Sequence, residues 1–249
     1  FGTLSRNTAV MMGTQALWSN PDFLGFTIAY EPNAFDGKDR QHINALNHDN
    51  TGRFLTYLTK LTNGRVAVEV LLDYETAELA PWYWQPKLQM NQYVTEPVLY
   101  PVQGVDVLMV SCMTPIIYQN EFLGTTGMDL SIDFIQSLIS EGDYYEGALQ
   151  AEIYSPQGVT VANRLNPEFI NKGLEELFAE SVDEELTSIA SGEMQMLLNN
   201  GRMELRIPLQ IGSSSALWQA RFSLPLSVIM QDANRLMFGQ LLVGFLLIL

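Results

Sequence analysis

Strand-like segments of this chain follow one another through short turns, and this order argues against a doubly wound parallel sheet. The turn Thr62-Asn63-Gly64 separates the segments 53–61 and 65–74, which are rich in β-branched and aromatic residues. The second half repeats the pattern, with turns at 155–158 and 199–201. Antiparallel strands can be joined by such turns, whereas parallel strands need a long crossover. The sequence therefore predicts an α+β fold with two antiparallel-sheet modules.

Periodicity places the remaining elements around these hairpins. Apolar residues at helical spacing predict helices over 4–18, 131–140 and 167–186, and Pro225 begins a last helix. A short irregular or helical stretch starts at Trp82. The further strands predicted are 24–30, 94–100, 105–113, 122–129, 149–154, 159–162, 194–198, 203–209 and 216–224.

The last segment, 236–249, is apolar apart from Gln240. A helix of this length rises roughly 20 Å, which is less than the roughly 30 Å hydrocarbon core of a bilayer. Asp232 and Arg235 precede the run, as charged residues do at a membrane interface. We interpret 236–249 as the start of a transmembrane helix; the alternative is a buried C-terminal core helix.

Composition and motifs exclude several classes of function. A formal net charge of −15 would repel a phosphate backbone, so no nucleic acid is expected as a partner. Cys112 is the only cysteine, and no Cys/His metal spacing occurs. His42 and His48 belong to no nucleophile motif. The segment 36–39 faintly resembles a calcium loop but lacks its spacing and is better read as a polar turn. We expect no catalytic residue, no metal and no cofactor.

Aromatic residues are concentrated in one short stretch. Tyr74, Trp82, Tyr83 and Trp84 fall within eleven positions, next to two prolines. Such a cluster can be part of the core, or it can bind an apolar or cationic ligand through its ring faces. Composition alone leaves both interpretations open.

Six strings carry a combined signal: 30–39 (YEPNAFDGKD), 49–54 (DNTGRF), 82–83 (WY), 95–97 (TEP), 114–116 (TPI) and 122–130 (FLGTTGMDL). Together they resemble a double Cache sensor domain, the periplasmic part of a bacterial methyl-accepting chemotaxis protein. The resemblance extends motif by motif over 1–140 and as an outline over 141–235.

This resemblance implies two tandem PAS-like Cache modules. Residues 1–140 would be the membrane-distal module with the ligand pocket, 141–235 the membrane-proximal module, and 236–249 the start of a transmembrane helix. The N-terminal helix would be the end of a largely missing stalk. The resemblance further implies a periplasmic sensor anchored in the bacterial inner membrane, a homodimer in the full-length receptor, and signal transduction in chemotaxis.

The resemblance also implies site residues. In amino-acid-binding members an Arg-x-Trp-Tyr segment holds the ligand carboxylate; Trp82 and Tyr83 match it, but Ala80 stands at the Arg position. Asp129 matches the Asp that accepts the ligand ammonium. Tyr74 approximates an upstream Tyr of the motif, one residue out of register. The family's Tyr-x-Asp pair after Thr-Glu-Pro is absent; Val98 and Tyr100 stand there instead, and Tyr100 completes the set of expected ligand-binding residues.

Without the guanidinium, a carboxylate clamp is missing, while a cation anchor and ring faces remain. An amine, a quaternary ammonium compound or an amino-acid-like molecule is therefore the expected ligand. Arg53 or Lys87 could instead replace the lost charge, and Asp129 could instead accept backbone amides at the helix that begins near Ser131. The alternatives for the whole protein are a histidine kinase, a cyclic-dinucleotide enzyme, or an anchored extracytoplasmic enzyme or binding protein.

Overall fold

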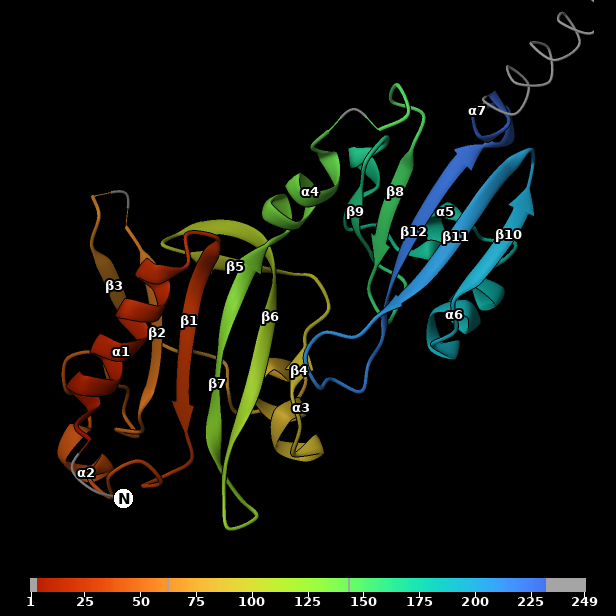
Figure 1. The fold of residues 1–249 in the computed structure, drawn as a ribbon. Coiled ribbons are helices and arrows are strands. Elements are labelled where there is room, and N and C mark those ends of the chain that lie inside the picture. The colour runs from red at the N-terminus through yellow and green to blue at the C-terminus, as the bar shows by residue number, and fades with distance from the viewer. Residues whose placement is uncertain (1–3, 62, 143, 232–249) are drawn as a thin grey trace, which may run out of the picture. The chain divides into compact units, whose positions relative to one another are not determined.

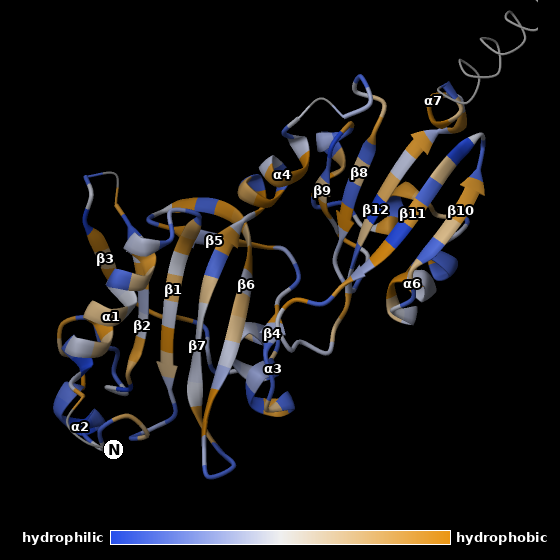
Figure 2. Cartoon of the chain, in the orientation of Figure 1, coloured by the Kyte–Doolittle hydropathy of each residue, from blue (hydrophilic) through white to orange (hydrophobic). Residues whose placement is uncertain are grey.

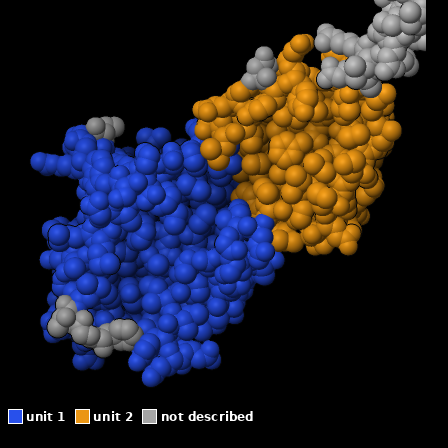
Figure 3. All heavy atoms as spheres, viewed as in Figure 1, with its two compact units in different colours: residues 1–135, 210–216 blue, residues 136–209, 217–249 orange. Residues whose placement is uncertain are grey.

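A computed structural model describes residues 4–61, 63–142 and 144–231, which form two compact units (Figures 1 and 3). Unit 1 comprises 1–135 together with 210–216, and unit 2 comprises 136–209 together with 217–249. Each unit contains one antiparallel sheet with helices packed on it. The α+β class with two antiparallel sheets is thus confirmed.

The sheet of unit 1 has seven strands in the order β3-β2-β1-β7-β6-β4, and β5 pairs with β6. The long β6–β7 hairpin has a hydrophilic tip (Figure 2). The strands are β1 (Phe23–Tyr30), β2 (Leu55–Lys60), β3 (Val66–Val70), β4 (Tyr93–Val94), β5 (Val98–Val102), β6 (Val105–Tyr118) and β7 (Glu121–Ser131).

Helices α1 (Arg6–Ser19) and α3 (Pro81–Gln89) cover opposite faces of this sheet. α1 packs so closely on the sheet at Gly13 that a Cβ there would collide with the side chains of Phe26 and Leu58. α3 packs on the other face, because its residue Tyr83 shares a buried cluster with Leu55. Residues of β2 alternate between the two faces, as a strand requires. Unit 1 also contains α2 (Asp39–His42), and α4 (Ile132–Ser140) leads out of it.

Arg6 fixes the start of α1 to the loop after β1. Its guanidinium donates to both Asp36 carboxylate oxygens, to Asp39 Oδ1 at 2.6 Å and to the Gly52 carbonyl at 2.8 Å. Arg6 and Asp39 are both buried. The segment 36–39 is therefore a turn whose two carboxylates share one arginine as their ion-pair partner.

Unit 2 has a five-stranded sheet in the order β10-β11-β12-β8-β9. Tyr154, Leu174 and Ile189 form its buried apolar cluster. Its elements are β8 (Gln150–Tyr154), β9 (Thr160–Asn163), the 3₁₀ turn η1 (Pro167–Phe169), α5 (Leu174–Leu177), α6 (Val182–Ser191), β10 (Gln195–Asn199), β11 (Arg202–Leu209), β12 (Trp218–Pro225) and α7 (Leu226–Ile229).

The predicted helix over 167–186 is wrong, since η1, α5 and the start of α6 share this range. The backbone before α5 pairs with the segment around β9 instead: Thr160 N–H donates to the Lys172 carbonyl, and Leu174 N–H donates to that of Gly158. Asn171 has a left-handed φ of 64°, which ends the η1 turn. Tertiary backbone pairing therefore overrides the helical spacing of the apolar residues.

The predicted strand over 94–100 is likewise interrupted, between β4 and β5. Pro97 has no N–H to donate to a ladder. At the break, the Thr95 hydroxyl accepts a hydrogen bond from the Ser111 N–H of β6 at 2.9 Å.

Within the described residues, no helix is both long and apolar enough to cross a membrane. The predicted transmembrane start at 236–249 lies outside the described residues. Of the helix predicted from Pro225 onward, the structure describes α7 and the next two residues.

Candidate ligand-binding site

The structure places all five predicted site residues on the α3 side of the first sheet. Tyr74 and Tyr83 belong to the buried cluster there, and Trp82 and Tyr100 pack against its edge. Asp129 reaches this face from β7 and is joined to it by Tyr57, a cluster member. The residues come from β5, β7, α3 and the loop after β3, so only the folded sheet brings them together.

Strand register explains why Asp129 faces this cluster. Gly25 of β1 pairs with Asp129 of β7, and Asp129 pairs with Ser111 of β6, so these residues share one face. Tyr57 of β2 pairs with Thr27, two residues from Gly25 along β1, and its ring leans across Gly25 toward Asp129. A Cβ at position 25 would collide with the Tyr57 hydroxyl and ring. The missing side chain of Gly25 is therefore what lets Tyr57 reach the carboxylate.

Asp129 is a buried carboxylate whose partners are neutral. It is 3% exposed. Tyr57 Oη donates to its Oδ2 at 2.7 Å, and the Ser111 side chain also hydrogen-bonds to it. Asp129 takes part in none of the ion pairs among the described residues. Burial raises its pKa, and the two hydrogen bonds only partly oppose this effect.

Asp129 does not cap the helix that follows it. The Phe134 N–H at the start of α4 donates to the Ser131 hydroxyl at 3.1 Å instead. The interpretation of Asp129 as a helix cap is therefore wrong, and its carboxylate is directed toward Tyr57 and Ser111.

Besides Asp129, two further carboxylates, Glu69 and Asp73, raise the pKa values of nearby phenols. Burial raises the pKa values of Tyr57 and Tyr100, and the charge of Asp129 raises both further. Glu69 also raises both, and Asp73 raises that of Tyr100. Glu69 and Asp73 are exposed. The Tyr57–Tyr100 pair, whose ring centroids are 5.8 Å apart, is thus in the field of one buried and two exposed acids.

Tyr83 organises the aromatic part of the cluster. Its ring meets Trp82, Trp84 and Phe122 edge-on, with centroids 5.7–6.1 Å apart. Its hydroxyl makes a short hydrogen bond to Glu31 and accepts one from Arg53 at 2.7 Å. Burial and the hydrogen bond to Glu31 raise the pKa of Tyr83, so this phenol stays protonated. These contacts hold the Tyr83 side chain in one position, so its role in the site is structural.

Arg53 and Lys87 have partners of their own. Arg53 donates to the Tyr30 carbonyl and lies over the Tyr74 ring, with its Cζ 4.9 Å from the centroid. Lys87 Nζ pairs with Glu31 at 2.7 Å. In the described structure neither cation pairs with Asp129, so neither neutralises the buried carboxylate.

Tyr74 is held at the edge of the cluster. Its hydroxyl donates to Asp49 Oδ2 at 2.5 Å. Trp84 Nε1 donates to the Tyr74 carbonyl at 3.0 Å, which ties the loop after β3 to α3. Burial acts to raise the pKa of Asp49, but hydrogen bonds from Thr51, Tyr74 and backbone amides outweigh it and lower the pKa.

Sequence reasoning missed Tyr57, Ser111, Gly25 and Glu31. Tyr57 shares the strand face of Leu55 in a β2 segment that is apolar or small on both faces, so alternation alone does not mark it. Gly25 carried a usable signal, because an isolated glycine in a strand indicates close approach by a neighbour. Glu31 is the second residue of a string that carried the family resemblance, but nothing in the sequence links it to Tyr83.

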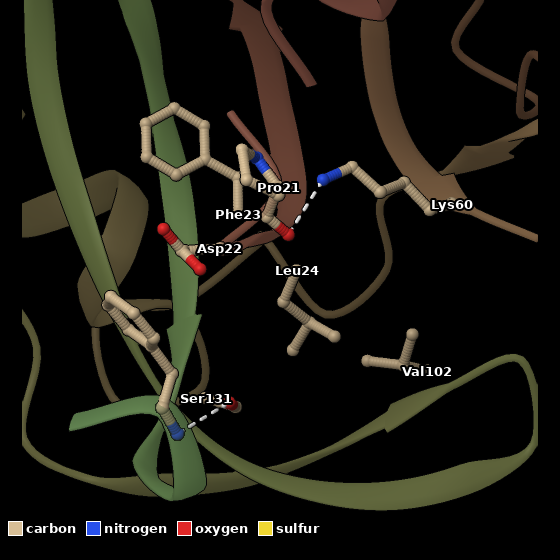
Figure 4. Close-up of a pocket in the computed structure, with 8 residues that line it drawn as sticks. Pro21, Asp22, Phe23, Leu24, Lys60, Val102 and Ser131 are labelled. Carbon is tan, nitrogen blue, oxygen red and sulfur yellow. Dashed lines mark hydrogen bonds between the residues drawn. The ribbon is translucent and has the colours of Figure 1, made fainter. Parts of the chain in front are cut away.

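A hollow of about 360 Å³ lies elsewhere in unit 1 (Figure 4). Lys60 Nζ donates to the carbonyls of Asn20 and Pro21 beside it. None of the five predicted site residues lines it. Its lining is Pro21, Asp22, Phe23, Leu24, Lys60, Val102, Ser131 and Phe134.

A bacterial chemotaxis receptor has a similar sequence. The chain is 28% identical over 231 residues to the methyl-accepting chemotaxis protein TlpQ of Pseudomonas aeruginosa, covering 88% of this chain and 32% of that protein. It thus spans about a third of that relative's length.

Two solved structures have the same fold. The extracellular domain of the putative histidine kinase mmHK1S-Z3 matches with a TM-score of 0.79 and 27% identity, over 95% of this chain and 85% of that one. The ligand-binding domain of the amino-acid chemoreceptor PctC of P. aeruginosa, solved with GABA, matches with a TM-score of 0.54 and 12% identity, over 90% and 83%.

The family model described as "Methyl-accepting chemotaxis protein-like, first PDC sensor domain" matches residues 11–137, which is about half of the chain and contains the whole aromatic site. The chain therefore belongs to the methyl-accepting chemotaxis protein-like family, and it is an extracytoplasmic ligand-binding sensor domain of chemoreceptor type, not an enzyme.

Proposed function

We propose that unit 1 binds a small organic cation, an amine or a quaternary ammonium compound, between Asp129 and the aromatic residues of α3 and β5. The observation that carries the proposal is Asp129, a buried carboxylate with hydroxyl partners and no ion pair among the described residues. A buried charge without a counter-charge costs free energy. A cationic ligand supplies that counter-charge.

The surrounding groups suit the same ligand. Trp82, Tyr100 and Tyr57 offer ring faces or edges, and each ring face over a cation contributes about 0.5–2 kcal/mol. Glu69 and Asp73 add negative potential at the exposed side of Tyr100. With a net charge of −15, the chain also attracts cations over a longer range.

An amino-acid-like ligand is the second candidate. It would need a partner for its carboxylate, and Ala80, fully buried at the N-terminus of α3, offers none. Arg53 is the available guanidinium, half-buried between the rings of Tyr74 and Tyr83. The structurally similar PctC domain was solved with GABA, which has both charges. In this case Asp129 would bind the ammonium and Arg53 the carboxylate.

A thermal-shift screen of the chain tests both candidates. The compounds are amines and quaternary ammonium ions, the corresponding amino acids, and organic acids. A ligand at a hundred times its Kd adds about 2.7 kcal/mol to the free energy of unfolding, which is several degrees in Tm. We expect stabilisation by amines. Stabilisation by amino acids alone would favour the second candidate, and stabilisation by organic acids alone would contradict both.

Beyond this domain, we propose that the complete protein is a receptor in the bacterial inner membrane. Residues 236–249 would begin a transmembrane helix, and two copies would pair in the full-length protein. Exposed Met11 and Trp18 lie seven residues apart on α1, and exposed Leu4 lies two residues before its start, so such pairing could cover this apolar side. Sedimentation of the full-length protein in detergent should show a dimer. The output is chemotaxis signalling; a histidine kinase or a cyclic-dinucleotide enzyme is the alternative.

A further inference from the structure

The C-terminal end of α3 is bound to the loop that joins β11 and β12. This loop, residues 210–216, is here called the strap, and it belongs to compact unit 1 although both flanking strands belong to unit 2. Asn91 Nδ2 donates to the Ser213 carbonyl at 2.7 Å, and Ser213 N–H donates to Gln92 Oε1 at 2.7 Å. The Ser213 hydroxyl lies 2.6 Å from Asn91 Oδ1.

Two more features make this contact specific. Gly212 has φ +59°, a left-handed conformation that favours glycine, and a Cβ there would displace the Gln92 amide from its present position. The other end of the Gln92 amide donates to Thr114 Oγ1 on β6 at 3.2 Å. The strap is therefore tied both to the end of α3 and, through Gln92, to the first sheet.

We infer that the strap positions α3, the helix that carries Trp82 and Tyr83, and couples it to β12. The inference rests on the proposed function only in naming α3 as part of the ligand site. Asn91, Gln92 and Ser213 are positioning residues, since they bond to one another just after the end of α3 and not to the cluster around Asp129.

The chain supplies a short physical route. α3 spans nine residues, and Asn91 and Gln92 follow its end closely. On the other side, β12 begins two residues after the strap and leads directly into α7. A shift of α3 on ligand binding therefore pulls on β12 through hydrogen bonds and covalent chain. Coupling of this kind is reciprocal, so a change in the strap also changes the affinity of the site.

Native-state hydrogen exchange of the whole chain, without ligand, tests the inference. In the Asn91→Ala/Gln92→Ala variant we expect the amides of α3 and of the start of β12 to exchange about three- to tenfold faster, which corresponds to the loss of about one net hydrogen bond. The β2–β3 hairpin and the β8–β9 hairpin should keep their wild-type rates. Faster exchange confined to 210–216 would overturn the inference.

Matched variants separate positioning from general damage. Leu88→Ala shortens an exposed side chain of the same helix, so α3 and β12 should keep their rates. Gln92→Glu retains the acceptor for Ser213 N–H and should restore much of the protection in an otherwise wild-type chain. If Gln92→Glu exchanged as fast as Gln92→Ala, the strap contact would not be the cause.

A ligand arm distinguishes this inference from the proposed function. The most stabilising amine from the thermal-shift screen is titrated into the wild type and the Asn91→Ala/Gln92→Ala variant, and we expect the Kd to rise about three- to tenfold. An unchanged Kd, together with faster exchange of the α3 and β12 amides, would show that the strap acts on β12 without affecting ligand affinity, and would overturn its coupling to the site. If no amine binds the wild type, the proposed function fails while the exchange result still decides the role of the strap.

Discussion

Asp129→Asn is expected to weaken binding of the organic cation by about 2–5 kcal/mol, which is ~30-fold to several thousand-fold in Kd. The amide keeps the size of the side chain and can still accept from the Tyr57 hydroxyl, but it cannot neutralise an ammonium. Isothermal titration of the most stabilising amine measures the loss. Asp106→Asn, an exposed carboxylate on β6, is the matched control and should leave the Kd unchanged. Equal affinities in wild type and Asp129→Asn would contradict the assignment.

The same variant should alter the pH dependence of stability. Burial raises the pKa of Asp129 in the folded state, so the folded chain binds this proton more tightly than the unfolded chain. Its contribution to stability is therefore fully present below the ordinary carboxyl pKa and is lost as the pH rises through the raised value. Asparagine does not titrate, so the Asp129→Asn variant does not lose this stability as the pH rises. Without ligand at neutral pH, we expect the variant to be at least as stable as the wild type in urea.

Binding should show the complementary trend. The cation is bound by the ionised carboxylate, so affinity in the wild type rises as the pH passes upward through the pKa of Asp129. This ligand-linked rise should be missing in Asp129→Asn. A wild-type affinity that falls with rising pH over this range would contradict a carboxylate anchor.

Arg6→Ala is expected to lower the free energy of unfolding by about 3–5 kcal/mol, because it leaves a buried carboxylate without its counter-charge. Asp39 is buried, and Arg6 bonds at once to Asp36, Asp39 and the Gly52 carbonyl. Urea unfolding at neutral pH measures the change. Arg40→Ala, an exposed arginine on α2, should cost less than about 1 kcal/mol.

A double variant separates charge from packing. Asp39→Asn removes the charge that Arg6 neutralises, so Arg6→Ala should cost less in an Asp39→Asn background. Additive losses, or a loss in Arg6→Ala no larger than in Arg40→Ala, would show that Arg6 does not hold α1 to the loop.

The sequence predicted the architecture where local signals and tertiary structure agree. Turn residues placed the β2–β3, β8–β9 and β10–β11 hairpins, because these turns need left-handed or tight backbone conformations whatever surrounds them. The range 167–186 had helical spacing, yet Gly158 and Thr160 draw its backbone into strand-like pairing. That competition involves segments apart in the chain, so periodicity alone does not reveal it.

For the site, the sequence supplied residues and the fold supplied their partners. Trp82, Tyr83 and Asp129 were selected by resemblance to a family motif, and the structure places them on one face. Tyr57 was missed because its contact with Asp129 depends on the register of three strands and on the missing side chain of Gly25. Glu31 pairs with Lys87, and the two residues lie far apart in the sequence, so no local pattern predicts this ion pair.

Comparing an amine with its neutral counterpart tests the central claim most directly. The most stabilising amine and the alcohol in which a hydroxyl replaces the ammonium are titrated into the wild-type chain at neutral pH. The two have similar size and apolar surface, so their difference in affinity reports the charge. We predict that the amine binds at least ~10-fold more tightly, and that Asp129→Asn removes this preference. Equal binding of amine and alcohol, or a preference that persists in Asp129→Asn, would contradict a cation site at Asp129.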